Sequence, residues 1–146
     1  MALDGDDNDA NRFFGALCRA VAPLGLTWEV DPVALAATAG ASKAQLRAAL
    51  AAFVNALCTT VAKPVVLVLD DLHRLDHPEV FALLEALLER LPDHVAVLIG
   101  TRIEPPLSLA RWRAHGELLE MGPADLRFEE ADASALASRK LPAADA

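Results

Sequence analysis

Residues 65–73 read Val65-Val66-Leu67-Val68-Leu69-Asp70-Asp71-Leu72-His73, and this stretch indicates the fold class of the chain. Its first five residues are continuously apolar and mostly β-branched, which is typical of a strand buried on both faces of a parallel sheet. Such a strand delivers the carboxylates that follow it to the carboxyl edge of the sheet, where open α/β folds bind ligands. The stretch therefore predicts a buried strand that ends in an acidic pair, Asp70 and Asp71.

Helices can be placed on both sides of this strand from capping residues and apolar spacing. Asn8 or Asp9 is expected to begin one helix, and Ser42 a second helix whose apolar side chains form a single stripe. After the strand, Asp76 is expected to cap a third helix, with Glu79 reaching back to close a capping box. The strand is therefore flanked by helices along the chain, as it would be in a βαβ unit.

Two further strands are expected downstream. Residues 95–100 form a second apolar run, and residues 117–121 form a weaker third one. Strands that alternate with helices pair in parallel, and right-handed crossovers place helices on both faces of the sheet. The sequence therefore predicts an α/β fold with a parallel sheet of about three strands. Because the chain begins with an acidic loop in place of a strand, we expect the natural domain to begin upstream.

Composition limits the classes of function that the chain can have. With 146 residues, 54% of them hydrophobic, the chain can bury a core and is not a disordered protein. Its net charge of −8 argues against phosphate binding driven by a basic surface. No apolar run is long enough to span a bilayer, and no signal peptide is evident, so a cytoplasmic location without membrane contact is expected. Cys18 and Cys58 form neither a metal-binding spacing nor a disulfide framework.

The acidic pair matches the Walker B pattern, in which a run of apolar residues ends in two acids. In that pattern one carboxylate, here Asp70, holds Mg²⁺ through water, and its neighbour Asp71 polarises an attacking water. The alternative is that a buried strand simply leads into a polar turn, where Asp71 or Asp76 caps a helix. The pattern is moderately specific, and both interpretations remain open from the residues alone.

Polar residues also follow the second predicted strand, as Gly100-Thr101-Arg102. A guanidinium at this position can read a terminal phosphate with its planar fork, and Thr101 would lie next to it. The alternative is a surface arginine that pairs with Asp70 or Asp71 across neighbouring strand ends. His73 is a further candidate for contacting phosphate, although a polar residue at a helix entry is the commoner explanation.

Three stretches carry more extensive motifs. Residues 3–13 contain Leu3-Asp4, then Asp7-Asn8-Asp9 and Arg12-Phe13, and residues 67–73 end in an acidic pair followed by a His. Residues 102–128 contain an Arg, paired prolines, Leu-x-Leu-Ala-Arg, a second Arg, Leu-Leu-Glu and Asp-Leu-Arg-Phe. Together these stretches resemble MalT-like signal-transduction ATPases of the LuxR family, which belong to the STAND class of AAA+-related regulators. The resemblance extends over about residues 3–139.

This resemblance implies a partial P-loop NTPase-like fold and a division of the chain. Residues 1–146 would be the C-terminal portion of a STAND NTPase domain, and residues 129–146 the start of the following helical region and a tail. The sequence contains no Gly-x-x-x-x-Gly-Lys-Ser/Thr motif. We therefore expect the family's P-loop upstream of Met1, and its helical sensor repeats and DNA-binding region downstream.

The implied function is a nucleotide-dependent signalling switch in a bacterial transcriptional regulator. ATP and Mg²⁺ would bind the intact domain, with Asp70 and Asp71 as catalytic residues and Arg102, Thr101 and His73 as nucleotide contacts. The chain alone is expected to bind Mg·ATP poorly, so that it carries no bound cofactor, and to be inactive. DNA and a small-molecule inducer would bind only regions outside these residues. The alternative is a non-enzymatic remnant or interaction module, whose incomplete sheet would favour self-association.

Overall fold

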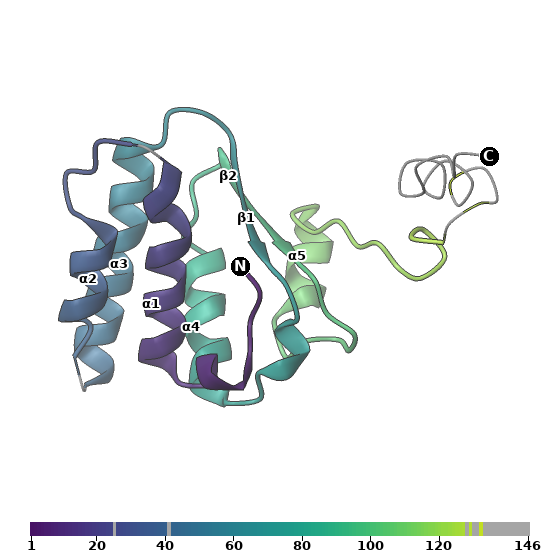
Figure 1. Cartoon of the computed structure of the whole chain (residues 1–146). Coiled ribbons are helices and arrows are strands. Elements are labelled where there is room, and N and C mark those ends of the chain that lie inside the picture. Colours follow the sequence, from purple (N-terminus) through teal and green to yellow (C-terminus); the bar gives the residue numbers. More distant parts are fainter. Residues whose placement is uncertain (25, 41, 128, 130–131, 133–146) are drawn as a thin grey trace, which may run out of the picture. The chain divides into compact units, whose positions relative to one another are not determined.

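The computed structural model describes residues 1–24, 26–40, 42–127, 129 and 132 (Figure 1). The chain divides into two compact units, Met1–Leu107 and Ser108–Ala146. The elements of the first unit are η1 (Gly5–Asp7), α1 (Ala10–Val21), η2 (Ala22–Leu24), α2 (Pro32–Thr38), α3 (Lys43–Thr60), β1 (Val65–Leu69), η3 (Leu72–Arg74), α4 (Pro78–Leu88) and β2 (Val95–Ile99). The mixture of helices with a parallel sheet confirms the predicted α/β fold class.

Two of the expected helix starts are formed by the capping residues that the sequence indicates. The carboxylate of Asp9 accepts hydrogen bonds from the backbone N–H groups of Asn11 and Arg12, both at 3.0 Å, and so begins α1. Ser42 and Gln45 form a reciprocal capping box at the start of α3. These contacts satisfy N–H groups that would otherwise have no partner within the helix.

The start of α4 differs from the prediction. Its N-cap is His77, whose Nδ1 accepts a hydrogen bond from the backbone N–H of Glu79 at 3.3 Å, and not Asp76. Asp76 is instead bound by the side chain of Asn8, which lies 68 residues earlier in the chain. Glu79 does not close a capping box either, because its carboxylate pairs with Lys43 of α3. Contacts with distant residues therefore decide this helix start.

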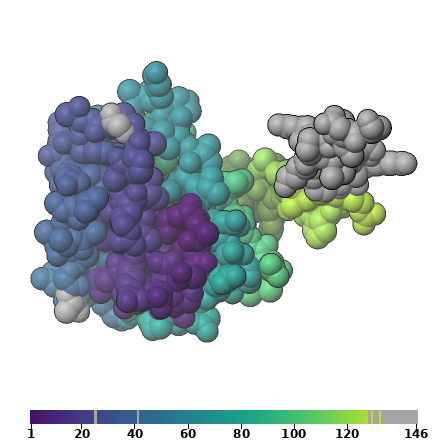
Figure 2. Space-filling model, in the orientation of Figure 1, coloured from purple at the N-terminus to yellow at the C-terminus, as the bar shows by residue number. Residues whose placement is uncertain are grey.

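The sheet contains two parallel strands, β1 and β2, in a register that runs from Val65 opposite Val95 to Leu69 opposite Ile99. On the other side of β1, Ala2 forms a parallel bridge with Asp70. The N-terminal residues thus lie against the end of β1, where Figure 2 shows them in purple beside the teal surface. The composition predicted a loop for the first residues, but in the structure Ala2 also pairs with the end of β1.

The third predicted strand, residues 117–121, is absent from the described structure. These residues follow α5 (Leu109–His115) in the second unit and have no strand partner among the described residues. Leu119 is 86% exposed, so the apolar side chains there do not face a core. A short apolar run without a neighbouring strand leaves its backbone groups unpaired, and water then satisfies them equally well.

The two faces of the sheet have different environments. Leu67 and Leu69 lie in the hydrophobic core, together with side chains of α1, α3 and α4. Val66, Val68 and Leu98 on the opposite face expose 59%, 40% and 54% of their surface. β1 is therefore buried on one face only. Helices were predicted on both faces of the sheet, and within Met1–Leu107 they cover one of these faces. Figure 1 shows α1 and α4 on the covered side.

Aromatic and leucine side chains form the centre of this core. Phe14 of α1 and Phe53 of α3 are fully buried, and their rings meet edge to face with centroids 5.8 Å apart. Leu84 of α4 and Leu69 of β1 are also completely inaccessible to solvent. Burial of side chains of this size contributes about 1.5–3 kcal/mol each, so the helical layer holds β1 firmly in place.

The second unit begins with α5, which ends at Gly116 in a left-handed backbone conformation with φ of 72°. Beyond it, Arg113 donates two hydrogen bonds of 2.7 Å to the carboxylate of Glu120. The predicted helix over residues 129–139 lies outside the described residues, apart from residues 129 and 132. Among the helices that the structure describes, none has the length and apolar character needed to cross a membrane.

Candidate functional site

The carboxyl end of the sheet brings Asp70 and Gly100 into direct contact. The backbone N–H of Gly100 donates to the carbonyl of Leu69 at 2.8 Å, and the N–H of Leu72 donates to the carbonyl of Gly100 at 3.0 Å. The carboxylate of Asp70 lies over Gly100, so that a Cβ at position 100 would be 2.4 Å from its Oδ1. A side chain at position 100 would therefore displace the carboxylate, a constraint that the sequence pattern does not reveal.

Asp70 is held by its backbone and keeps an accessible carboxylate. Its N–H donates to the carbonyl of Met1 at 2.9 Å, and its carbonyl accepts from the N–H of Leu3 at 3.0 Å. Its Oδ1 accepts from the N–H of Asp71 at 2.9 Å. The side chain is exposed at the edge of the sheet. An oriented and solvent-accessible carboxylate of this kind can bind a hydrated cation.

Asp71 has a left-handed backbone, with φ of 61° and ψ of 33°, and is the only non-glycine residue with positive φ in the described part of the chain. This conformation is costly for residues with a side chain, and Asp and Asn tolerate it best. Asp71 occupies the N-cap position of η3, but its side chain accepts no capping hydrogen bond. The carboxylate instead faces two bases, with its Oδ1 3.8 Å from His73 Nδ1 and its Oδ2 3.6 Å from Arg74 Nε. Helix capping therefore does not explain this acid.

His73 and Thr101 lie near the acidic pair, and each has a distinct environment. His73 Nδ1 is buried and has no hydrogen-bond partner among the described residues, and the Asp71 carboxylate lies 3.8 Å from it. The hydroxyl of Thr101 donates to the carbonyl of Ile103 at 2.8 Å and stabilises the turn that follows β2. Because that bond uses its only proton, the Thr101 hydroxyl can accept from a donor such as water, and it would have to leave the Ile103 carbonyl to donate to a phosphate oxygen.

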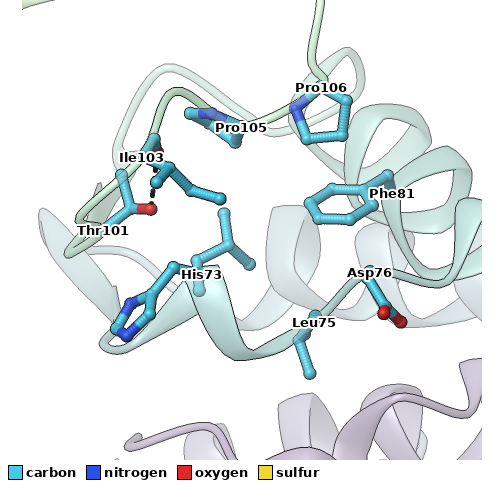
Figure 3. A pocket seen from close by; sticks show the side chains of 9 residues that line it. His73, Leu75, Asp76, Phe81, Thr101, Ile103, Pro105 and Pro106 are labelled. Atoms are coloured by element: carbon cyan, nitrogen blue, oxygen red, sulfur yellow. Dashed lines mark hydrogen bonds between the residues drawn. The ribbon is translucent and has the colours of Figure 1, made fainter.

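A small hollow of about 210 Å³ lies beside these residues (Figure 3). Its lining includes His73 and Thr101 together with Leu72, Phe81, Ile103 and Pro106. In Figure 3 the imidazole of His73 points away from Phe81 and Pro106, while Ile103 points into the hollow. Asp70 and Asp71 are not part of this lining. Because its walls are mostly apolar, the hollow is separate in character from the carboxylate edge, and we do not assign it to a phosphate.

Arg102 lies two residues beyond Gly100 and is exposed. It follows the end of β2, as Asp70 and Asp71 follow the end of the neighbouring β1, and a shared site of the three residues stays a prediction. Within the described residues it forms no ion pair with either acid, so the alternative of a simple surface pair across the strand ends is not seen. A guanidinium that is not committed to a carboxylate can bind a phosphate.

The donor set at this edge fits Mg²⁺ only in part. The described residues contain no group of three His, Cys, Asp or Glu side chains that could hold a metal ion by themselves. Asp70 offers one carboxylate with an unoccupied oxygen, and Mg²⁺ is commonly bound by one or two carboxylates with waters and substrate phosphates as the other ligands. The residues present thus suit a cation that arrives together with a nucleotide.

Asn8 is a residue of this region that sequence reasoning placed only as a helix cap. Its Oδ1 accepts hydrogen bonds from the N–H groups of Asp76 and His77, at 3.0 and 2.8 Å, and its Nδ2 donates to the Asp76 carboxylate. Asn8 therefore closes the far end of the loop that starts at Asp71. The only sequence signal for this role is its position inside the acidic motif of residues 3–13.

Two neighbouring parallel strands whose carboxyl ends present an acidic pair and an arginine define a partial P-loop NTPase-like α/β domain. A family model described as the AAA ATPase domain matches residues 2–99, which is 98 of the 146 residues. The chain belongs to this family.

Two curated relatives indicate which kind of AAA ATPase protein the chain is similar to. The HTH-type transcriptional regulator MalT of Cronobacter sakazakii is 32% identical over 71 residues, and the MalT of Serratia proteamaculans is 31% identical over 71 residues. Each match covers 49% of this chain and 8% of the relative, so the matched region spans a small part of those proteins. The similarity to MalT-like AAA+ regulators that the sequence motifs indicated is confirmed.

Proposed function

We propose that the carboxyl edge of this sheet is the magnesium-binding side of an ATP site in a MalT-like transcriptional regulator, and that nucleotide binding there switches the regulator between conformations. The observation that carries the proposal is the juxtaposition at the ends of β1 and β2. Asp70 is oriented over Gly100, Asp71 follows it without a capping role, and Arg102 follows the end of β2, the strand next to β1. Membership of the AAA ATPase domain family supports it.

Each residue at this edge has a proposed task that follows from its contacts. The accessible carboxylate of Asp70 would hold the hydrated Mg²⁺, which supplies positive charge to the phosphates when it is bound. Asp71 would accept a hydrogen bond from the attacking water and orient it, with His73 and Arg74 keeping its carboxylate in place. Arg102 would bind the terminal phosphate, with His73 as a nearby polar contact. Thr101 would become a second contact when its hydroxyl turns from the Ile103 carbonyl to donate to the phosphate.

The switch requires two conformations that differ in their affinity for the nucleotide. Arg102 and Thr101 follow β2, whereas Asp70 and Asp71 follow β1, so a nucleotide bound by both groups would join two separate loops. A conformation in which these loops are held together would be favoured by ATP and released after hydrolysis. DNA and an inducer would act through regions outside these 146 residues.

This chain by itself is expected to bind Mg·ATP only weakly. The P-loop backbone and lysine make most of the phosphate contacts in this class of site, and the sequence contains no such motif. Titration of the chain with a fluorescent ATP analogue should therefore show affinity weaker than low micromolar. Low-micromolar binding would mean that another part of the chain contacts the phosphates.

The proposal is tested by locating this weak binding. A ¹⁵N-labelled chain is titrated with Mg²⁺ and a non-hydrolysable ATP analogue at millimolar concentration, and amide shifts are followed by NMR. We expect shifts at residues 70–73 and 100–102, weakened about tenfold by Asp70→Asn or Arg102→Gln, which corresponds to one charge-assisted contact. Asp93→Asn and Arg47→Gln are matched controls, because both residues are exposed and lie away from this edge.

Shifts confined to other surfaces, or equal effects of the control variants, would contradict this assignment. Omitting Mg²⁺ gives a further check. Without the cation, the response of residues 70 and 71 should decline more than that of residue 102, because only the carboxylates depend on it to approach phosphate.

A second candidate function, self-association without nucleotide, is favoured by the open face of the sheet. Val66, Val68 and Leu98 form an apolar surface that is about half exposed, and β2 has no second strand partner among the described residues. Exposed apolar patches and unpaired strand edges both promote association, and a second copy of the chain offers the same surface. Sedimentation velocity should then show a dimer that weakens in the Val68→Thr/Leu98→Thr variant. A monomer at all accessible concentrations would exclude this candidate.

A further inference from the structure

The loop between β1 and α4 is gripped at both of its ends by one short N-terminal segment, residues 1–8. At the near end, the backbone of Asp70 exchanges hydrogen bonds with Met1 and Leu3 at 2.9 and 3.0 Å. At the far end, Asn8 binds Asp76 and His77 through its side chain. Leu3, whose N–H makes one of the bonds at the near end, is only 2% exposed and belongs to the core. Residues 1–8 therefore connect the two ends of the loop, and we call this segment the N-terminal brace.

We propose that Asn8 is a positioning residue for Asp71, acting through the closure of this loop. The inference rests on the proposed nucleotide site, because it assigns to Asn8 the task of presenting one of that site's carboxylates. Among the described residues, the hydrogen bonds of the Asn8 side chain go to residues 76 and 77 and not to Asp70 or Asp71. It acts by fixing residues 76 and 77, so that the few residues between them and Asp70 must span a set distance.

The loop is short enough for this constraint to reach Asp71. Only residues 71–75 separate the two grips, and η3 occupies three of them. Within it, the N–H of Arg74 donates to the carbonyl of Asp71 at 3.0 Å, and the N–H of Leu75 donates to the carbonyl of Leu72 at 3.1 Å. A tight turn with fixed ends leaves Asp71 few conformations, which accounts for its left-handed backbone.

The chemistry of the far grip explains why an amide is needed at position 8. The carbonyl oxygen of Asn8 accepts two backbone N–H groups, and its NH₂ group donates to a carboxylate. An aspartate there could accept both N–H groups but would repel Asp76, and an alanine could make none of these contacts. Asn8 and Asp76 are therefore a matched pair whose side chains could be exchanged.

The alternative is that the buried leucines hold the loop without help. Leu72 and Leu75 are 0% and 3% exposed, and the N–H of Leu72 is bound to Gly100. If these anchors suffice, loss of the Asn8 contacts should disturb only residues 76 and 77. The two explanations thus differ in what happens at Asp71 and Arg74, which Asn8 does not touch.

The test uses the full chain and four variants: Asn8→Ala, Asn8→Asp, Asp76→Asn and the exchange variant Asn8→Asp/Asp76→Asn. Amide hydrogen exchange and chemical shifts are measured by NMR, and urea unfolding shows that each variant is folded. In Asn8→Ala, exchange at Arg74 and Leu75 should accelerate about tenfold or more, and the Asp71 amide should shift. The variant Asn8→Asp/Asp76→Asn should restore both. An aspartate at position 8 still accepts the two backbone N–H groups, and the amide at position 76 now donates to it.

Unchanged signals at residues 71, 74 and 75 in Asn8→Ala would overturn the proposal, and so would a failure of the exchange variant to restore them. If Asn8→Ala does not fold, the comparison of Asn8→Asp with the exchange variant makes the same distinction. The Mg·ATP-analogue titration is repeated on each variant, and in Asn8→Ala the ligand-induced shift of the Asp71 amide should fall several-fold. A loop that loosens in Asn8→Ala when the unaltered chain shows no ligand response would refute the nucleotide site and leave the brace standing.

Discussion

Replacing Gly100 with alanine tests the contact that orients Asp70. The added Cβ would lie 2.4 Å from Asp70 Oδ1, and an ordinary contact begins at 3.4 Å. The carboxylate oxygen must therefore move away by about 1 Å, which requires the Asp70 side chain to rotate. Withdrawal breaks the 2.9 Å hydrogen bond from the Asp71 N–H to Asp70 Oδ1. The backbone of the strand pair has little freedom to give way, because Gly100 is hydrogen-bonded to Leu69 and Leu72.

The magnitude follows from two opposing effects. An off-rotamer side chain costs about 0.5–1.5 kcal/mol, and loss of a hydrogen bond whose partners water can reach costs about the same. Against this, alanine lowers the conformational entropy of the unfolded chain and contributes about 0.4–1 kcal/mol of stability. We expect Gly100→Ala to lower the free energy of unfolding by about 1–2 kcal/mol, which is roughly 0.5–1 M in the urea midpoint.

A double-mutant cycle with Asp70→Ala decides whether the clash is the cause. In the Asp70→Ala chain the oxygen is gone, so Gly100→Ala should be neutral or stabilising by up to about 1 kcal/mol. Gly5→Ala is the matched control, because a Cβ there meets nothing within 4 Å and should change little. Equal destabilisation by Gly100→Ala in both backgrounds would refute the reasoning, since the cost would then come from the backbone and not from the carboxylate.

Three further predictions concern the core, a helix start and the thiols. Phe53→Ala removes the ring that meets Phe14 edge to face and should lower the free energy of unfolding by about 3–5 kcal/mol in urea. Asp9→Ala removes the N-cap of α1 and should cost about 1 kcal/mol in the same assay. Burial raises the pKa of the Cys18 thiol from 9.0 to about 12, so at pH 8 a disulfide reagent should label Cys58 alone in the folded chain.

Each of these has its own control. Val66→Thr, on the open face, should change stability by less than about 0.5 kcal/mol, and a loss as large as that of Phe53→Ala would contradict the described core. Asp6→Ala removes an exposed acid outside α1 and should cost less than Asp9→Ala. The protonated Cys18 thiol contributes fully to stability below pH 9, and this contribution is lost as the pH rises from 9 toward 12. Labelling of both thiols at pH 8 would show that Cys18 is accessible.

Local sequence signals predicted the elements that rest on local physics. The apolar, β-branched runs predicted both strands, although only one face of β1 is buried. The cap of α1 and the capping box of α3 use neighbouring residues only. The acidic pair was placed correctly at the sheet edge, since the end of a buried strand determines where the next residues emerge. Their proposed roles remain predictions.

The remaining features depend on residues that are distant in sequence. Asp76 has the composition of a helix cap but is bound by Asn8, 68 residues away, so His77 caps α4 instead. Residues 117–121 have an apolar pattern, but a strand needs a neighbour, and none of the described residues provides one. The space over Gly100 likewise becomes visible only when β1 and β2 are placed side by side.

At Asp71, which has a left-handed backbone, selection for stability and selection for the proposed chemistry favour different residues. Glycine or asparagine would relax that conformation, and either change should make the chain more resistant to denaturants. Both replacements remove the carboxylate that the proposed chemistry requires. A screen for variants of higher stability would therefore enrich substitutions at position 71 that abolish the proposed activity. Stability engineering of this domain should leave Asp71 unchanged.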